Sequence, residues 1–200
     1  MKTLIIYAHP NTDGHCPRIL KEVESVLKER KKDYEILDLY AMNYDAVMHE
    51  SEHYTSGGRE VSQLNKGIQA KISAADRLIF IYPVWWSMMP AVMKGFFDKV
   101  FTPGFAFRFR TMPIFSRIFG GYPVKMLKGK KAAVFLTTGT HRLLTMIFLG
   151  NRFKSIIKHD ILGFFGIKAK VWHIDKATQM NDRQMRKIRK AVKKGIGWLC

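Results

Sequence analysis

The stretch Leu78-Ile79-Phe80-Ile81-Tyr82-Pro83-Val84-Trp85-Trp86-Ser87-Met88-Met89-Pro90 decides the fold class. An apolar run of strand length comes first, and a proline-bounded turn with two tryptophans follows it directly. Open α/β sheets bind ligands in a crevice at the carboxyl ends of their strands, where loops offer backbone amides and aromatic faces. The stretch therefore predicts a strand that ends at a binding crevice. Burial of Trp85 and Trp86 as large core residues is the alternative.

Other apolar runs of strand length are separated by helical patterns: Thr3 to Ala8, Tyr34 to Leu39, Ala132 to Thr137 and Lys170 to Ile174. Nearly continuous apolar strands that alternate with helices are typical of a parallel sheet covered on both faces. Five such strands, without an early GxGxxG motif, favour a flavodoxin-like order over a dinucleotide-binding Rossmann order. We predict an α/β fold with a doubly wound, five-stranded parallel sheet and helices on both faces.

The predicted helices have recognisable starts. One helix follows Pro17, and Pro90 begins another. Asn181 with Gln184 three residues later indicates a capping box at the start of the last helix. The stretches 40–60 and 105–131 are the least regular and are typical of functional loops.

Length and composition indicate one domain, residues 1–200, in a reducing compartment. The 200 residues contain no linker-like stretch, and the two cysteines, Cys16 and Cys200, form neither a disulfide framework nor a metal motif. No apolar run reaches the roughly 18 residues of a membrane span, and the first residues do not form a secretory leader. We expect a cytoplasmic protein without a metal site.

The net charge of +18 is confined to the second half of the chain. Residues 1–100 carry 13 basic and 13 acidic side chains, whereas residues 101–200 carry 21 basic side chains and three acids, Asp160, Asp175 and Asp182. Such a field attracts NADPH phosphates, an anionic membrane surface or nucleic acid. No nucleic-acid motif accompanies the charge, so we expect no specific nucleic-acid partner. A merely solvated basic face is the alternative.

The turn after the first predicted strand has the chemistry of a phosphate site. It runs from His9 through Gly14 and His15 to Cys16, where the next helix begins. Backbone N–H groups at a helix N-terminus are unsatisfied, and the helix dipole favours an anion there. An ordinary β-to-α turn rich in Gly, Asn and Asp has the same composition. Cys16 is expected to be structural rather than catalytic.

A third loop places small hydroxyl residues and a glycine at the end of another strand: Thr137, Thr138, Gly139 and Thr140. Together, the three loops offer phosphate amides, an aromatic wall and polar groups for the edge of a planar ring, which is what a flavin requires. His141 follows them and is a candidate for a proton donor. An exposed loop histidine is the alternative.

These segments resemble the quinone reductase family of flavodoxin-fold NAD(P)H oxidoreductases, which includes DT-diaphorase and shorter bacterial relatives. The resemblance spans most of the chain, and its most specific block runs from Phe80 through Trp86 and Met89-Pro90 to Phe101. The flanking segments are weaker: Ile5 to Pro10, Asp38-Leu39-Tyr40, Gly104 to Phe107 and Thr137-Thr138-Gly139.

The resemblance implies a homodimeric flavoprotein that passes a hydride from NADPH or NADH through flavin to a quinone or a similar flat acceptor. FAD is slightly favoured over FMN, and NADPH over NADH. The implied flavin contacts are His9, Gly14, His15, Cys16, Pro83, Val84, Trp85, Trp86, Ser87, Thr137, Thr138, Gly139 and Thr140. Phe105, Ala106 and Phe107 correspond to a segment that walls the substrate pocket, often across the dimer interface.

Two departures from the family pattern limit this transfer. Relatives commonly have Ser-Phe-Asn where this chain has Gly14-His15-Cys16, and larger members have Tyr and His side chains where Leu143, Leu144 and Met146 stand. The catalytic roles of those Tyr and His side chains are therefore not assigned to any residue of this chain. A flavodoxin-fold electron carrier or regulatory subunit, docking on an anionic or membrane partner, is the alternative function.

Overall fold

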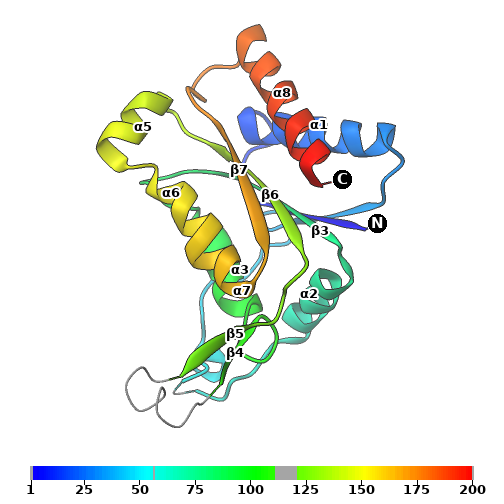
Figure 1. Ribbon diagram of the computed structural model, residues 1–200, viewed down its shortest axis with the longest axis vertical. Coiled ribbons are helices and arrows are strands. Elements are labelled where there is room, and N and C mark those ends of the chain that lie inside the picture. Colours follow the sequence, from blue (N-terminus) through cyan, green and yellow to red (C-terminus); the bar gives the residue numbers. More distant parts are fainter. Residues whose placement is uncertain (1, 56, 111–120, 200) are drawn as a thin grey trace.

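A five-stranded parallel sheet forms the centre of the molecule (Figure 1), seen in a computed structural model that describes residues 2–55, 57–110 and 121–199. The strand order is β2-β1-β3-β6-β7, and every neighbouring pair is parallel. The sheet strands are β1 (Thr3–Tyr7), β2 (Tyr34–Asp38), β3 (Arg77–Pro83), β6 (Lys131–Thr137) and β7 (Lys168–Ile174). This is the predicted flavodoxin-like order, and all five predicted strands are confirmed to within two residues at either end.

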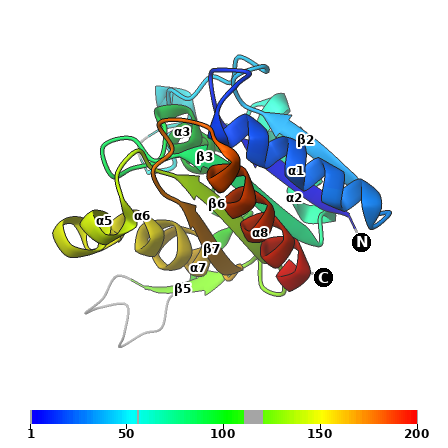
Figure 2. The same cartoon turned by 90° about the horizontal axis from the view of Figure 1, so that it is seen from above.

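Helices cover both faces of the sheet. Two helices, α1 (His15–Glu29) and α8 (Asp182–Leu199), lie side by side over one face (Figure 2). The other face carries α2 (Gln63–Ala74), α3 (Ala91–Val100), α6 (Arg152–Ser155), the π-helical segment η2 (Ile156–Leu162) and α7 (Gly163–Phe165). Alternate strand residues enter the two cores: Ile5 and Ile79 face α1 and α8, whereas Leu4 and Phe80 face α3.

The order in which the strands are added to the sheet reverses at β1, because β2 lies on one side of it and β3 on the other. The connection through α1 leads from β1 to β2 on one side, and the connection through α2 leads back to β3 on the other side of β1. Loops after β1 and β3 therefore separate towards opposite faces and leave a crevice between them, which is the usual ligand position in such sheets. In the part of the chain that the structure describes, no helix is long and apolar enough to cross a bilayer.

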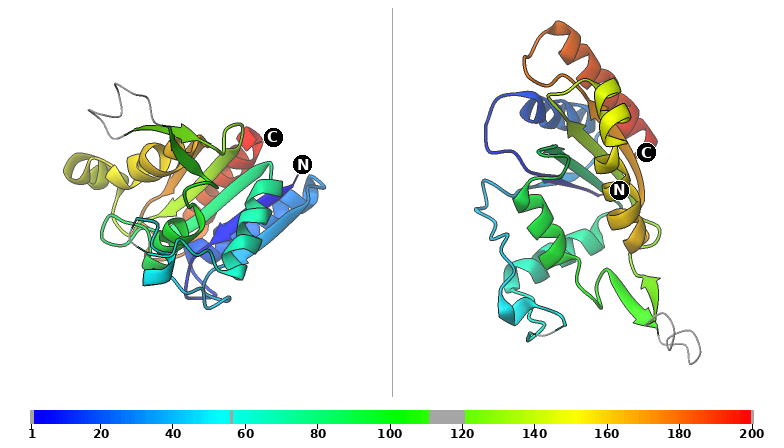
Figure 3. Two further views of the ribbon diagram at one scale, coloured as in Figure 1. Left: turned by 90° about the horizontal axis from the view of Figure 1, so that it is seen from below. Right: turned by 90° about the vertical axis from the view of Figure 1, so that its left-hand side faces the viewer.

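The segment 105–131, predicted to be irregular, contains a second, two-stranded antiparallel sheet. Its strands are β4 (Phe107–Arg110) and β5 (Tyr122–Lys125), and residues 111–120 between them lie outside the described residues. The two strands project from the main body near α7 (Figure 3). Residues 40–60, also predicted to be irregular, contain the 3₁₀ turn η1 (Glu50–Glu52).

The start of α8 confirms half of the predicted capping box. Asn181 Oδ1 accepts a hydrogen bond from Gln184 N at 3.0 Å, as an N-cap does. The Gln184 side chain does not complete the box, because its Nε2 donates at 3.1 Å to the carbonyls of Asp175 and Lys176 instead. Gln184 thus ties α8 to the loop that follows β7.

Candidate functional site

The loops after β1, β3 and β6 lie together at the carboxyl edge of the sheet. Two hydrogen bonds connect the strand ends: Ala8 N donates to Ile81 O at 3.0 Å, and Val84 N donates to Thr137 O at 2.8 Å. The three predicted cofactor loops are therefore neighbours in space. A fourth loop joins them, because Thr138 N donates to Ile174 O at 3.1 Å at the end of β7.

The tryptophan turn holds an indole out in solvent. Trp85 and Met88 exchange backbone hydrogen bonds of 2.9 Å, and the two residues between them have left-handed φ values, 50° for Trp86 and 60° for Ser87. Both positions of this type I′-like turn normally favour glycine or asparagine, because left-handed backbone costs about 1–2 kcal/mol for other residues. The Trp86 side chain is 99% exposed and Trp85 is 43% exposed. The alternative of two buried core tryptophans is therefore wrong.

The first loop leaves the N-terminus of α1 open. Gly14 is the N-cap with φ 116°, and it supplies no capping side chain; a Cβ built there meets no atom within 4 Å. No acidic residue stands in the first turn of the helix. The N–H groups of that turn and the positive end of the helix dipole are therefore available to an anion. His9 braces the loop, because its Nδ1 accepts a hydrogen bond from Asn11 N at 3.1 Å.

His15 and Cys16 point their side chains into the protein rather than offering them on its surface. The Cys16 Sγ lies 3.4 Å from Thr137 Oγ1, and burial raises the pKa of the thiol to about 12. Cys16 is thus a protonated structural thiol, and only its backbone N–H belongs to the phosphate turn. The His15 ring is buried as well, and burial together with Lys187 lowers its pKa. Its Nε2 has no hydrogen-bond partner among the described residues.

A hydrogen-bond chain fixes the third loop. The Thr138 hydroxyl donates to Thr140 O at 3.0 Å and therefore accepts from His173 Nε2 at 2.7 Å, which assigns the Nε2–H tautomer to neutral His173. Protonation would place a second proton on His173 Nδ1, a buried atom without a partner among the described residues. Burial and then the charge of Lys154 accordingly lower the pKa of His173 to about 4.

His141 has a structural role in this arrangement. It is the N-cap of α5 (Arg142–Leu149), where its Nδ1 accepts from Leu143 N at 3.2 Å. Its other nitrogen lies 3.9 Å from Asp175 Oδ2. Burial raises the Asp175 pKa, but the ammonium of Lys187 and the N–H of Arg142 outweigh that effect and hold the pKa at about 2. This geometry favours the alternative, an exposed loop histidine, over a proton donor.

The segment predicted to wall the substrate pocket is not part of the crevice of its own chain. Ala106 and Phe107 are buried, and the β4–β5 hairpin lies at the end of the molecule away from α5 (Figure 1). Phe107 packs against Phe164 and Phe165 and lines a separate aromatic cavity of about 340 Å³. Phe105 packs on Phe101. Within one chain, core packing holds Phe107 against Phe164 and Phe165. The expectation that Phe105 to Phe107 wall the substrate pocket therefore stays a prediction for a site that a partner subunit completes across a dimer interface.

Sequence reasoning missed two groups of residues at this edge. His173, the last residue but one of β7, bonds Thr138, and Asp175, the first residue after β7, bonds Arg142 N beyond the third loop. Two polar residues at the end of a predicted strand were the signal that could have found them. Tyr7 and Asp38 line a cleft of about 560 Å³ beside His9, where Asp38 Oδ1 also accepts from Tyr40 N at 3.1 Å. The cleft lies between the first loop and the end of β2.

Helix α5 presents a nearly continuous apolar surface. Six of its eight residues are large hydrophobic residues with exposed fractions between 42% and 76%: Leu143, Leu144, Met146, Ile147, Phe148 and Leu149. The helix follows the third loop directly and projects from the body of the protein (Figures 1 and 2). An exposed apolar patch of this kind marks an interaction surface.

The residues at the edge of the sheet fit a flavin nucleotide. The uncapped N-terminus of α1 and the Gly14 turn suit its phosphate, the exposed indoles suit a planar ring, and the hydrogen-bonded Thr138 loop provides polar groups. Among the described residues, no three His, Cys, Asp or Glu side chains come together as metal ligands would.

Comparison with known proteins shows the flavodoxin-like fold and finds NAD(P)H oxidoreductases among the similar proteins. A family model described as "Flavodoxin-like fold" matches residues 1–195. An uncharacterized NAD(P)H oxidoreductase of Haemophilus influenzae is 30% identical over 70% of this chain and 66% of its own length. Mouse ribosyldihydronicotinamide dehydrogenase [quinone] is 27% identical over 94% of this chain and 86% of its own length.

Two solved structures are similar along almost their whole length. Smu.1420 from Streptococcus mutans superposes with a TM-score of 0.83 at 29% identity and covers 98% of this chain and 100% of its own. The NAD(P)H:quinone oxidoreductase of Methanothermobacter marburgensis has a TM-score of 0.82 at 25% identity and covers 99% of this chain and 96% of its own.

Proposed function

The chain belongs to the flavodoxin-like fold family, and on that basis we propose that it is a flavin-dependent NAD(P)H oxidoreductase that reduces a quinone or a similar flat acceptor. The observation that carries this proposal is the meeting of three loops with complementary chemistry at the β1/β3 crevice: the open helix N-terminus at Gly14, the solvent-exposed indoles of Trp85 and Trp86, and the hydrogen-bonded Thr138 loop. The names of the mouse and Methanothermobacter relatives support the same activity.

Each loop has its own part in holding the cofactor. Backbone N–H groups of His15 and Cys16 bind the flavin phosphate, with the side chain of Cys16 left buried. Trp85 and Trp86, with the backbone of Pro83, Val84 and Ser87, border the ring. Thr138, Gly139 and Thr140 contact the polar edge of the ring, and Thr137 and His173 keep that loop in place.

The bound flavin supplies hydride transfer between a nicotinamide and an acceptor. The protein orients the two substrates over one ring face, shields them from water and offers amide and hydroxyl donors where charge develops. His173, held neutral, donates its Nε2–H to Thr138 and so keeps the Thr138 hydroxyl directed at Thr140 O. This arrangement requires no dedicated catalytic acid.

The cofactor is FAD rather than FMN and the donor NADPH rather than NADH. The resemblance to dimeric quinone reductases supports FAD, and the positive field of the second half of the chain supports NADPH. The protein acts as a cytoplasmic homodimer. The apolar surface of α5 beside the third loop supports the dimer, because a partner subunit can cover it. A partner there would place the site between two chains.

Titration of flavin-free protein with FAD and FMN, followed by steady-state assay with NADPH and a small naphthoquinone, tests the function. We expect tight binding of one flavin per chain, with FAD bound more tightly, and flavin-dependent consumption of NADPH. Flavin binding without any turnover would contradict the enzymatic role. Failure to bind either flavin would contradict the assignment of the three loops.

A second candidate function is an electron carrier or regulatory subunit that docks on an anionic or membrane partner. Exposed α5 and the basic residues that follow it, Arg152 and Lys158, favour this role, because apolar and basic groups together suit an anionic lipid surface. Co-sedimentation with vesicles that contain phosphatidylserine separates the two roles: a carrier binds them, whereas a dimer that buries α5 does not.

A further inference from the structure

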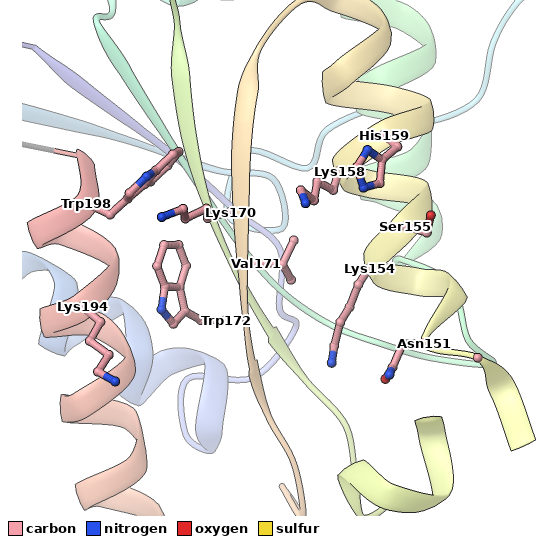
Figure 4. Close-up of a pocket in the computed structure, with 11 residues that line it drawn as sticks. Asn151, Lys154, Ser155, Lys158, His159, Lys170, Val171, Trp172, Lys194 and Trp198 are labelled. Atoms are coloured by element: carbon pink, nitrogen blue, oxygen red, sulfur yellow. The ribbon is translucent and has the colours of Figure 1, made fainter. Parts of the chain in front are cut away.

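A groove of about 710 Å³ lies across the open edge of the sheet, remote from the tryptophan turn. Strand β7 is the last strand of the sheet, and α6 with η2 stands on one side of it and α8 on the other (Figure 4). Lys154 and Lys158 project from the first wall, while Lys170 on β7 and Lys194 on α8 belong to the opposite side. The volume is typical of sites for small molecules.

The groove carries only positive charge. Four of its eleven lining residues are lysines, another is His159, and no aspartate or glutamate lines it. None of these four lysines forms an ion pair with a carboxylate among the described residues. Lys154 is half-buried, and burial followed by the charge of Arg142 lowers its pKa, although Asp175 opposes this. Uncompensated like charges repel one another, so an anion that binds among them is stabilised.

Backbone groups of β7 are available at the floor of the groove. Lys168 N donates to Lys130 O, and Ile174 O accepts from Thr138 N, so the even-numbered residues of β7 bond towards β6. Because residues of a parallel strand alternate, the N–H and C=O of Val171 point towards the open edge. Val171 also lines the groove. A donor and an acceptor next to each other match the edge of a nucleobase.

Two indoles add an aromatic wall. Trp172 and Trp198 lie with ring centroids 6.0 Å apart, and both line the groove while remaining partly exposed. Lys170 Nζ lies 5.1 Å from the centroid of the Trp198 ring, so a cation stands directly beside the aromatic surface. A ligand that is both planar and anionic matches these two features.

We propose that this groove is a binding site for a nucleoside polyphosphate, separate from the flavin crevice. The lysines of both walls hold the phosphates, and the base lies against Trp172 with its edge at the backbone of Val171. Lysines on an edge strand can also serve only to prevent strand pairing between molecules. That explanation covers Lys170, but not Lys154, Lys158 and Lys194, which are on helical elements.

Calorimetric titration with ATP at low salt tests the site, using full-length protein saturated with its flavin so that the first-loop phosphate site is filled. We expect saturable binding of one ATP per chain. Inorganic triphosphate should bind about tenfold more weakly, because it has no base to stack against the indole. No saturable binding up to several millimolar overturns the proposal, and equal affinity for triphosphate overturns the nucleoside assignment.

Paired variants show whether the groove is the site. Lys154→Gln with Lys170→Gln removes one charge from each wall and should weaken ATP binding by at least about twentyfold. Lys28→Gln with Lys190→Gln removes the same charge from exposed positions outside the groove and should change the affinity by less than about threefold.

A second pair of variants and an RNA oligonucleotide complete the test. If the first pair unfolds, Lys158→Gln with Lys194→Gln, both at exposed positions, should give the same loss of affinity. Equal losses in groove and control variants overturn the proposal. An adenosine-only RNA oligonucleotide that binds more than tenfold more tightly than ATP overturns it in favour of a nucleic-acid surface.

Discussion

Replacing His173 by glutamine should make the folding stability less dependent on pH. The pKa of His173 is about 4, compared with about 6.5 for an ordinary histidine. Because the folded-state pKa is the lower one, the stability due to neutral His173 is complete above pH 6.5 and declines as the pH falls towards 4. Full linkage corresponds to a loss of about 2.5 kcal/mol between pH 7.5 and pH 4.5.

The expected effect is smaller than this limit. The ring is partly exposed, so solvent screening reduces it, and we expect about 1 kcal/mol. Glutamine keeps an N–H donor for Thr138 but does not titrate. The free energy of unfolding of His173→Gln should therefore fall by about 1 kcal/mol less than that of the unchanged protein between pH 7.5 and 4.5, measured by urea denaturation monitored by circular dichroism.

Other titratable groups also affect how the stability depends on pH. His15 also has a lowered pKa and contributes in the same direction, so some pH dependence should remain in the variant. Asp175, with a pKa of about 2, affects stability only below about pH 4 and lies outside the window. His159→Gln, at an exposed position, is the matched control and should behave like the unchanged protein. An identical pH dependence in His173→Gln would refute the role assigned to the buried Nδ1.

Three further predictions concern packing and the crevice. Gly195→Ala should lower the free energy of unfolding by about 1–2 kcal/mol in urea denaturation, because a Cβ there clashes with the Phe135 ring. Gly197→Ala, with open space around it, should raise the free energy of unfolding by about 0.5–1 kcal/mol. Equal effects would contradict this packing. Lys99 anchors the 40–60 loop, because its Nζ forms ion pairs with Asp45 at 2.9 Å and with Glu52 at 3.0 Å. Lys99→Met should lower the free energy of unfolding by about 3 kcal/mol in the same assay, because the largely buried Glu52 loses its partner, whereas Lys94→Met, which removes only the exposed pair with Asp98, should be nearly neutral. A neutral Lys99→Met would contradict this anchoring. Trp86→Ala should leave the melting temperature within about 2 °C but weaken flavin binding about tenfold by fluorescence titration, since its indole is 99% exposed; unchanged flavin affinity would remove Trp86 from the site.

The sheet could be predicted because its signal is local. Runs such as Leu78 to Tyr82 are apolar on both sides, and the strands they form are buried on both faces. The turn at Trp85 and Trp86 was recognisable from its prolines and its place after a strand, and its exposure confirms that these tryptophans are not core residues.

The parts that escaped prediction depend on contacts between distant residues. Phe107 pairs across a hairpin with Lys125 and packs on Phe164 and Phe165, which no local pattern in 105–131 indicates. The role of His173 depends on a hydroxyl 35 positions earlier in the chain. The lysine groove likewise assembles α6, η2, β7 and α8, although the sequence did locate the excess charge in this half of the chain.

The cofactor residues, too, were predictable where the signal is local and not where it depends on packing. Backbone features, such as the glycine turn before α1 and the small residues after β6, were visible in the sequence. Side-chain direction was not: His15 and Cys16 were expected as cofactor contacts, yet helix packing turns both side chains inward.

The visible absorption spectrum of the flavin-loaded protein, recorded anaerobically before and after one equivalent of NADPH, tests the central claim most directly. We predict rapid bleaching of the flavin bands and return of the absorbance when a quinone is added. A bound flavin that stays oxidised in NADPH would contradict the proposed reductase and leave the carrier role as the better account.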